Sequence, residues 1–428
     1  MRPKKCLLIT SSGGGGHLEA AKAKAHELRE KDTNLIIVQR DILLDWLGKP
    51  LGGLLAGCWN FAQKRGDVAF QKVMIHNMYL VGLFIWLPIF LHAFFLIYRQ
   101  DVDLIIDTQP NGTSAIVTAI ILAEKCKKLS RRYEKILVDL PTDKAGHYFK
   151  AVKKLRPKKR AIIHFITTKP LLQKGQTEEE FWEKHTGLPL ENIIYSHFPL
   201  RPKFKNLDPL PKHESCTIAP KIPSDEEWTL IQAVLDKGHL DYDYCAPYLD
   251  ITIPPNAHVS TLMLGSQPAK KATQAYVKSF IQLKTTLAMH REDLLFVFCR
   301  SHRTKKSLLN QVCDLITNLK KFPNSLTIIP LTFQDDTVIA PLFARSDATL
   351  TRSGGITSME LLSIMQGQIW IHSESKKPHD LLHGIPFWEK GNAKYLEAEK
   401  NAVIITPELF PTKAQNYFTA SGLADKLA

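Results

Sequence analysis

Two glycine turns, one in each half of the 428-residue chain, carry the residues best suited to chemistry. The first, SSGGGGH at residues 11–17, follows the apolar run CLLIT, and the second, RSGGITSME at residues 352–360, follows ATLT. Each pattern predicts a strand, a glycine turn and a helix. Such a turn binds anions because backbone N–H groups are free there, the helix dipole adds positive potential, and glycine permits close approach.

His17, at the end of the first turn, is the candidate base. The start of a helix disfavours the protonated imidazole, and a neutral imidazole accepts a proton from an attacking hydroxyl. A lone histidine is more often structural, but four adjacent glycines favour a catalytic role. We therefore predict His17 as catalytic, with Gly14, Gly15 and Gly16 as a loop for the acceptor or a phosphate. Neither turn matches a Walker loop or a dinucleotide fingerprint.

Short apolar runs alternate with helical patterns along the whole chain, which is typical of doubly wound parallel sheets. Strands are expected in the first half at residues 5–10, 34–43, 103–108, 135–141, 161–168 and 191–200. A second series is expected at residues 260–266, 294–300, 325–331, 348–351, 368–374 and 402–406. We predict an N-terminal domain over residues 1–204, a linker or insertion over 205–258 with a helix at Asp225–Lys237, and a C-terminal domain over 259–428.

Composition limits the partners. A formal net charge of +14 attracts phosphate, nucleic acid or an anionic bilayer. The chain has no helix-turn-helix, aromatic RNA-binding motif or zinc knuckle, which argues against nucleic acid. Seven scattered cysteines without a CxxC pair favour reduced thiols in a cytosolic compartment over a disulfide frame or a zinc site.

The stretch Leu80–Tyr98 is the strongest hydropathy signal and is long enough for a transmembrane helix. A span is disfavoured because it would place strands of one sheet on opposite sides of a membrane. A helix or helix pair packed on the sheet is expected instead, either wholly buried or partly available to lipid. The basic runs at residues 127–132 and 153–160 favour a membrane face, and solvated basic loops are the alternative.

Several of these segments together resemble the GT-B glycosyltransferases of the monogalactosyldiacylglycerol synthase and peptidoglycan lipid-intermediate glucosaminyltransferase type. The resemblance covers most of the chain in order. It is carried by SSGGGGHLEAAKA, DLIIDTQP, LVDLPTDKAGHYF, YSHFPLRPKF, LMLGS, SDATLTRSGGITSMELL and PFWEKGNAKYLEAEKNAVII. The two C-terminal matches are the most specific. The resemblance implies a GT-B fold, in which two Rossmann-like domains face each other across a cleft.

The resemblance also implies a role for each matching residue. Gly354, Gly355 and Thr357 would hold a diphosphate at the start of a helix, with Arg352 near the phosphates. Glu360 would accept hydrogen bonds from ribose hydroxyls, which a carboxylate does well because it takes two donors. The remaining expected donor-binding residues are Gly265 and Ser266 at the phosphate or sugar, and Glu389 and Asn392 at the sugar hydroxyls.

The chain departs from this family at several positions. Glu389 stands where the family usually has glutamine, and Thr108–Gln109 stand where it has histidine. His197–Phe198 replace a glycine. Asp241 and Asp243 form a D-x-D pattern used by metal-dependent transferases, but they lie in a polar insertion, so we expect a surface position and no metal site.

These observations predict a transferase, with no cofactor and no metal. It would move a sugar from a UDP-sugar to a lipid or lipid-linked acceptor, with His17 as base, at the cytoplasmic side of a membrane to which the protein is peripherally associated. A nucleotide-sugar epimerase or hydrolase of the same fold is one alternative. A degenerate, non-enzymatic protein that binds nucleotide sugar or membrane is the other.

Overall fold

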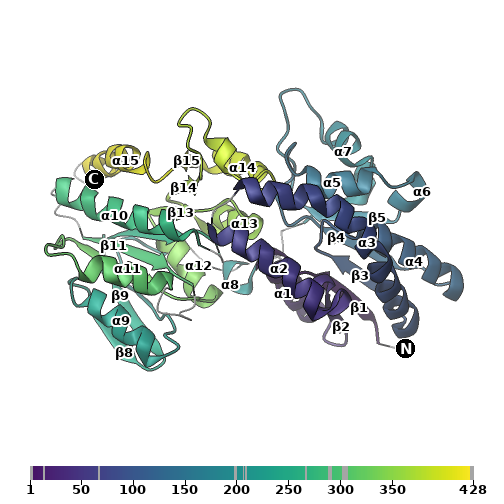
Figure 1. The fold of residues 1–428 in the computed structure, drawn as a ribbon, viewed down its shortest axis with the longest axis horizontal. Coiled ribbons are helices and arrows are strands. Elements are labelled where there is room, and N and C mark those ends of the chain that lie inside the picture. Colours follow the sequence, from purple (N-terminus) through teal and green to yellow (C-terminus); the bar gives the residue numbers. More distant parts are fainter. Residues whose placement is uncertain are drawn as a thin grey trace.

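The chain forms two α/β domains side by side (Figure 1). The computed structural model describes residues 3–12, 15–65, 68–196, 200–205, 207, 210–265, 268–287, 292–300 and 307–424. Each domain is built on a six-stranded, wholly parallel sheet. The predicted fold class, two doubly wound Rossmann-like domains in the GT-B arrangement, is confirmed.

The N-terminal sheet has the strand order β2-β1-β3-β4-β5-β6. Its strands are β1 (Lys5–Thr10), β2 (Ile36–Asp41), β3 (Leu104–Asp107), β4 (Arg132–Ile136), β5 (Ile163–Thr167) and β6 (Ile193–Tyr195). The helices of this half are α1 (Gly15–Lys31), η1 (Ile42–Trp46), α2 (Gly48–Arg65), α3 (Val68–Gln100), α4 (Thr113–Lys127), α5 (Gly146–Lys153), α6 (Pro157–Arg160), α7 (Glu178–Thr186) and η2 (Leu190–Asn192).

The expected strand at residues 135–141 is displaced in the structure. The strand β4 ends at Ile136, and the apolar residues Leu137, Val138 and Leu140 continue beyond the sheet. They are nevertheless buried in the N-terminal core, and the backbone of this segment also meets the C-terminal domain. An apolar run indicates that its residues are buried but does not show whether they form a strand. The sequence therefore predicted a start of the strand about three residues too late.

The apolar stretch Leu80–Tyr98 lies within α3, a single 33-residue helix that contains Pro88. Ile85, Ile89, Ala93 and Ile97 recur every four residues and are buried in the N-terminal core. The opposite face is exposed, so the helix has one core-facing side and one apolar side in contact with solvent. None of the described helices is both long enough and apolar enough to cross a bilayer.

The C-terminal sheet has the strand order β12-β11-β10-β13-β14-β15. Its strands are β10 (His258–Met263), β11 (Asp293–Phe298), β12 (Leu326–Leu331), β13 (Ala348–Thr351), β14 (Gln368–His372) and β15 (Val403–Ile405). The helices of this half are α10 (Lys270–Leu287), α11 (Leu308–Thr317), α12 (Asp336–Arg345), α13 (Gly355–Ile364), η3 (Leu381–Gly384), α14 (Lys390–Lys400) and α15 (Phe410–Ala424).

The segment between the two sheets is folded onto the C-terminal half. It contains α8 (Pro202–Lys205), α9 (Asp225–Leu235) and a small antiparallel sheet of β7 (Cys216–Ile218), β8 (Tyr242–Cys245) and β9 (Tyr248–Ile253). Its apolar side chains join the C-terminal core. Asp241 and Asp243 are both exposed, at and beside the start of β8.

The two domains pack directly against each other. Ile356 and Met359 of α13, in the C-terminal half, belong to the buried cluster of the N-terminal domain. Trp59 of α2 and Trp388, just before α14, bring their rings to 5.1 Å across the same boundary. The interface therefore lies at the helix that follows the second glycine turn, where the donor residues are predicted.

Candidate functional site

The two predicted glycine turns lie close together at the domain interface. A Cβ built on Gly16 would lie 3.6 Å from Val138 Cγ1 and 3.8 Å from Ile356 Cγ1, so α1, the end of β4 and α13 converge there. His17, Thr108 and Asp139 follow the carboxyl ends of β1, β3 and β4, which are neighbours in the sheet. Parallel α/β sheets bind ligands at this edge.

His17 lies in the first turn of α1 and is held by a backbone carbonyl. Its Nδ1 is 2.8 Å from Thr108 O, and a carbonyl only accepts, so Nδ1 carries the hydrogen and Nε2 carries the lone pair. The Tyr148 hydroxyl donates to the same carbonyl at 3.1 Å and lies 3.4 Å from Nδ1. This tautomer is the one a base acting through Nε2 requires.

A buried ionic network lies beside Thr108, at the ends of β3 and β4. Lys135 Nζ donates to Asp107 Oδ2 at 2.6 Å and to Gln109 O, and the Tyr133 hydroxyl donates to Asp107 Oδ2 at 2.8 Å. Burial lowers the pKa of Lys135, and the Asp107 carboxylate opposes that effect. The network fixes the backbone on both sides of the carbonyl that orients His17.

The first turn of α13 begins at Gly355, with Gly354 as N-cap. Nothing lies within 4 Å of a Cβ built on Gly354, whereas a Cβ on Gly355 would lie 1.8 Å from Val138 O. Glycine at Gly355 is therefore required by the approach of the N-terminal domain. Ser353 is buried, and its Oγ has no hydrogen-bond partner among the described residues. Thr357 is partly exposed in the same turn.

Glu360 is engaged in an ion pair that the sequence did not predict. Its Oε1 and Oε2 accept from Nε and Nη2 of Arg201 at 2.6 and 2.8 Å. The carboxylate is 0% exposed and the Arg201 side chain 14% exposed. In this conformation both oxygens already have charged donors, and a ribose hydroxyl does not reach them from solvent. The predicted ribose role therefore needs Arg201 to share or release the carboxylate.

Asn392 is also engaged by protein groups. Its Oδ1 accepts from Leu140 N at 2.7 Å, and its Nδ2 donates to Asp139 Oδ1 and Ser353 O, both at 2.8 Å. The side chain is fully buried between the domains. In this arrangement the amide joins the two halves of the chain, whereas the sequence led us to expect it at a sugar hydroxyl.

Arg352 and Glu389, two further predicted donor residues, both have charged neighbours. Arg352 Nη2 lies 3.5 Å from Glu374 Oε1, which also contacts His372 Nε2 at 3.1 Å. Burial raises the pKa of Glu389 to about 7, the Asp139 charge adds to that rise, and Arg352 opposes it. A carboxyl with a pKa in this range is suited to act as an acid or a base near neutral pH.

Glu389→Gln is expected to remove a pH-dependent loss of stability. Because the pKa of Glu389 rises from 4.5 to about 7 on folding, the folded state keeps a proton that the unfolded chain releases. The wild type should therefore lose stability relative to the variant as the pH rises from 4.5 to 7, by up to about 3 kcal/mol. Urea unfolding of both proteins across this pH range measures the gap, which is the difference between their free energies of unfolding. A gap that does not change with pH would contradict the prediction.

The remaining predicted residues are less constrained. Gly265 has a φ of +79°, which favours glycine in the turn after β10. Gly15 begins α1 and Gly16 follows it. Gly14, Ser266, His197 and Phe198 lie outside the described residues.

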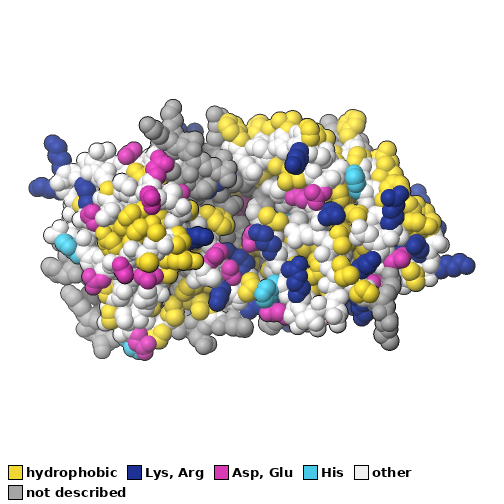
Figure 2. Space-filling view, turned by 90° about the horizontal axis from the view of Figure 1, so that it is seen from below, with side chains coloured by type: hydrophobic (Ala, Val, Ile, Leu, Met, Phe, Trp, Pro, Cys, Tyr) yellow, Lys and Arg dark blue, Asp and Glu magenta, His cyan; other side chains and the backbone are white. Residues whose placement is uncertain are grey.

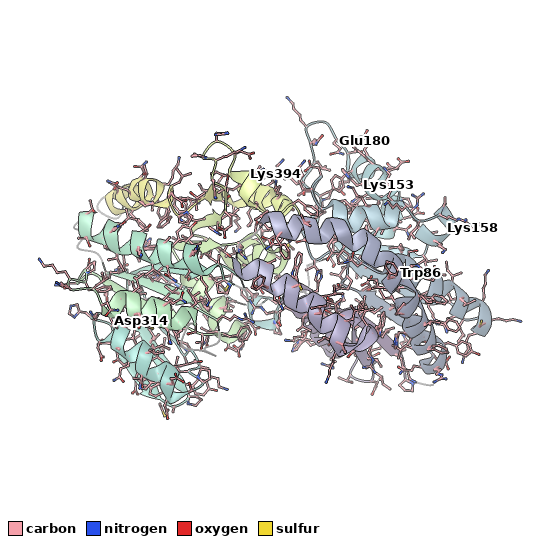
Figure 3. The ribbon with its side chains drawn as sticks, viewed as in Figure 1. Trp86, Lys153, Lys158, Glu180, Asp314 and Lys394 are labelled. Atoms are coloured by element: carbon pink, nitrogen blue, oxygen red, sulfur yellow. The ribbon has the colours of Figure 1, made fainter. Side chains whose placement is uncertain are left out.

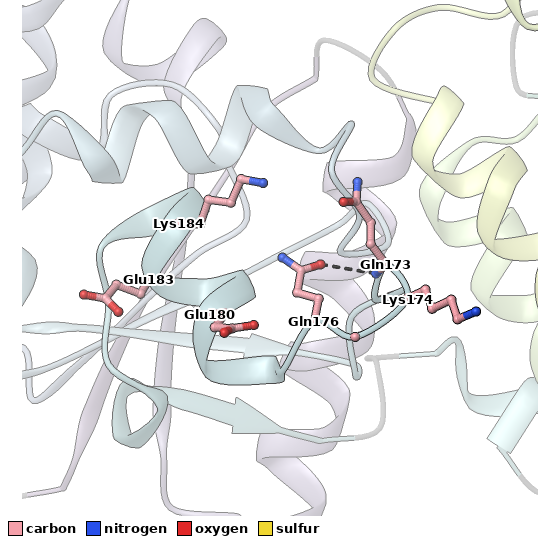
Figure 4. Close-up of a pocket in the computed structure, with 7 residues that line it drawn as sticks. Gln173, Lys174, Gln176, Glu180, Glu183 and Lys184 are labelled. Carbon is pink, nitrogen blue, oxygen red and sulfur yellow. Dashed lines mark hydrogen bonds between the residues drawn. The ribbon is translucent and has the colours of Figure 1, made fainter.

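Each domain carries a hollow among its described residues. One, of about 520 Å³, lies at the carboxyl ends of β14 and β15 and includes Glu374, so it adjoins Arg352. The other, of about 500 Å³, lies beside α7, and Figure 4 shows the Gln173 N–H donating to Gln176 Oε1 at its rim. Its charged lining is Lys174, Glu180, Glu183 and Lys184. No predicted site residue lines this second hollow, so we assign it no ligand.

Comparisons with known proteins found similarity to solved structures at low sequence identity. No family model and no curated protein matches the chain. MurG from Acinetobacter baumannii superposes with a TM-score of 0.48 at 13% identity, over 97% of this chain and 91% of that one. UDP-GlcNAc 2-epimerase from Neisseria meningitidis, bound to UDP-GlcNAc, superposes with a TM-score of 0.42 at 12% identity, over 98% of this chain and 100% of that one.

The spinosyn rhamnosyltransferase SpnG, complexed with thymidine diphosphate, gives a TM-score of 0.43 at 8% identity, over 98% of this chain and 91% of that one. These solved structures include a rhamnosyltransferase and an epimerase. The similarity is one of fold and does not distinguish between the two reactions.

Sequence reasoning gave no role to Arg201 and Asp139, which bond across the interface, or to Tyr148, which contacts His17 and Thr108 within the N-terminal domain. Each lies inside a segment quoted for the family resemblance, LRPKF or LVDLPTDKAGHYF. The sequence therefore indicated the segments, but it did not indicate which residues bond to them. The partner of Arg201 is 159 positions away, and that of Asp139 is 253 positions away.

Proposed function

We propose that the protein transfers a sugar from a UDP-sugar to a hydroxyl of a lipid or lipid-linked acceptor at a membrane surface. The observation that carries this proposal is the pairing of His17 with the Thr108 carbonyl, directly opposite the start of α13. That pairing leaves Nε2 as the proton-accepting nitrogen at the interface between the domains.

In the proposed step the acceptor hydroxyl attacks the anomeric carbon of the donor. The new carbon–oxygen bond forms as the bond to the β-phosphate oxygen breaks, UDP leaves with the electron pair, and the acceptor proton passes to His17 Nε2. A base positioned in this way contributes roughly 10²–10⁴-fold to a rate. The proposal does not require a metal ion.

The leaving diphosphate would lie at the first turn of α13. Gly354 leaves open space there, the Ser353 hydroxyl is a buried donor without a described partner, and Arg352 supplies positive charge nearby. Free N–H groups and the helix dipole stabilise the negative charge that develops on the departing oxygen. Glu389, with its pKa near 7, would face the sugar.

The acceptor class is inferred from the surface of the N-terminal domain. Phe84, Leu87, Leu91, Phe95 and Tyr98 line the outer side of α3, and Phe84 is 82% exposed. Figure 2 shows hydrophobic side chains gathered along one edge of this half of the molecule. So large an apolar face is uncommon on a monomeric soluble protein.

Basic residues border this face. Lys127 Nζ lies 4.7 Å from the centroid of the Tyr98 ring, so the run 127–132 begins beside the end of α3. Lys159 of the run 153–160 donates to Thr118 of α4, which packs on α3. Figure 3 shows Lys153 and Lys158 at the outer end of the N-terminal half. An apolar face edged by cations fits an anionic bilayer surface.

The direct test is incubation of the full chain with radiolabelled UDP-sugars and total membrane lipid. Label in the organic phase supports the proposal. Label released as free sugar would point to a hydrolase, and an altered nucleotide sugar without transfer would point to an epimerase.

The membrane contact predicts a loss of vesicle binding in Phe84→Asp/Leu87→Asp. Removing two exposed apolar side chains from the interface costs about 1.5–3 kcal/mol each, so affinity for vesicles containing anionic lipid should fall at least 100-fold. Flotation with the vesicles measures it. Leu190→Asp, at a leucine outside α3 that is 40% exposed, is the control. Equal binding by all three proteins would contradict the contact.

One observation favours a second candidate, a non-enzymatic protein. Glu360 and Asn392, two of the predicted donor ligands, are both buried and bonded to protein groups. Isothermal titration with UDP distinguishes the candidates. Binding by the wild type that weakens in Glu360→Gln supports the transferase, and no binding by the wild type favours the second candidate.

A further inference from the structure

The segment of residues 138–142, which follows β4, fits closely into a cradle on the C-terminal domain. Gly355 and Gly391 form two sides of the cradle, because a Cβ on either would collide with Val138 O or Thr142 Oγ1, at 1.8 and 2.2 Å. Asn392 lies between these contacts and bonds to Asp139 and Leu140. Every residue from 137 to 142 is buried or half-buried.

Only one orientation of the Asn392 amide satisfies its partners. The Leu140 N–H is a donor, so it must face Oδ1, and the Ser353 carbonyl is an acceptor, so it must face Nδ2. The second Nδ2 hydrogen then points at the Asp139 carboxylate, at 2.8 Å. Such a bond to a charged acceptor is stronger than one between neutral groups, and burial strengthens it further.

The bonds of Asn392 join the two halves of the candidate site. Asp139 follows β4, next to the strand whose end carries Thr108 and so the partner of His17. Ser353 immediately precedes Gly354, the N-cap of α13. One amide thus spans from the edge of the sheet that carries the base to the first turn of the helix that would hold the diphosphate.

We propose that Asn392 and Asp139 form a clamp between the domains and act as positioning residues. The clamp sets the distance between His17 and the first turn of α13, and neither residue needs to touch substrate. The part of this proposal that concerns catalysis rests on the proposed function. The part that concerns domain position does not.

The test is an exchange of the two residues. Asn392→Asp places two carboxylates face to face and removes both Nδ2 hydrogens, so the domains should separate. In Asn392→Asp/Asp139→Asn the new amide at position 139 again donates to a carboxylate, so the contact between residues 139 and 392 returns with its polarity reversed, while the Ser353 carbonyl stays without its donor. Asp139→Asn alone completes the cycle of variants.

Small-angle scattering and the rate of trypsin cleavage between the domains measure separation without any substrate. We expect Asn392→Asp to increase the radius of gyration and to raise the cleavage rate at least tenfold, and the double variant to recover part of both changes, because only the contact with residue 139 returns. Separation that is equal in the single and double variants would overturn the clamp, as would a single variant that behaves like the wild type.

A steric variant covers the case in which Asn392→Asp does not fold. Gly355→Ala should open the same contact because its Cβ would overlap Val138 O. Gly354→Ala, whose Cβ meets nothing within 4 Å, is its control for domain separation. A compact Gly355→Ala protein that resists trypsin as the wild type does would overturn the cradle geometry.

Kinetics separate positioning from donor binding. In Asn392→Asp we expect kcat to fall at least 30-fold while the Kd for UDP changes less than threefold, with recovery of kcat in the double variant. A fall in UDP affinity as large as the fall in kcat would overturn the positioning role in favour of a ligand role. Scattering and proteolysis decide the clamp even if the wild type binds no UDP, so the two proposals fail separately.

Discussion

Replacing His17 by alanine should lower sugar transfer by roughly 10²–10⁴-fold, the range that a general base contributes. The reason is geometric: the Thr108 carbonyl holds the hydrogen on Nδ1, so Nε2 is the atom that receives the acceptor proton. The diphosphate would be held by α13, which His17 does not belong to. The Kd for UDP should therefore stay within about threefold of the wild-type value. This corresponds to less than 1.4 kcal/mol of binding free energy, the amount that changes Kd tenfold.

The measurement is turnover with saturating donor, paired with isothermal titration of UDP. His26→Ala is the matched control, because His26 lies on the same helix with its side chain half exposed and pairs only with Glu30 among the described residues. Turnover by the control should equal that of the wild type. Equal losses of turnover and UDP affinity in His17→Ala would contradict a base and indicate a structural histidine.

Replacing Arg201 by alanine should lower the free energy of unfolding by about 3–5 kcal/mol, the cost of breaking a buried ion pair from one side. The variant leaves the Glu360 carboxylate buried and without its two charged donors. Burial already raises the pKa of Glu360, and Arg201 is the main group that opposes the rise. Without Arg201 the pKa should rise further.

This rise gives the variant a distinctive pH dependence. A carboxyl whose pKa is raised in the folded state destabilises the protein above its unfolded pKa of about 4.5, and the effect disappears as it gains a proton. The deficit of Arg201→Ala should therefore shrink as the pH falls from neutral toward 4.5. Chemical unfolding at several pH values measures it. Lys203→Ala, an exposed cation on the neighbouring α8, is the control.

A deficit below about 1 kcal/mol would mean that the pair behaves as a surface salt bridge, contrary to its burial. The result also bears on the donor site. If nucleotide binding draws Arg201 away from Glu360, UDP should stabilise the ion pair less than it stabilises the rest of α13. The Arg201→Ala protein should then bind UDP no more weakly than the wild type does.

Much of the architecture followed from local patterns. The strands β1, β3 and β10 through β15 lie within two or three residues of their expected positions, because buried parallel strands are short apolar runs between turns. The helix over Leu80–Tyr98 was expected, and so was its packing on the sheet. The question left open, whether it was wholly buried, is decided by its exposed outer face.

The failures have a shared cause. The strand β4 begins with Arg132, Tyr133, Glu134 and Lys135, which look polar in sequence, and Lys135 is buried only because Asp107 and Gln109 accept its hydrogen bonds. Hydrogen-bond partners that are distant in sequence therefore allow a polar run to lie in the core. The apolar residues that follow were taken for the strand, although they lie beyond its end and are buried in the core of the same domain.

The sequence by itself determined which elements form and which turns lie at the strand ends, because these depend on residue types a few positions apart. It also indicated His17, the glycine turns and α13 as the places for chemistry. Only the tertiary structure decided what Glu360, Asn392 and Gly355 contact, since each meets a group more than 150 positions away. A buried side chain bonds to whatever the packing of the domains brings within about 3 Å, and no local pattern encodes that choice.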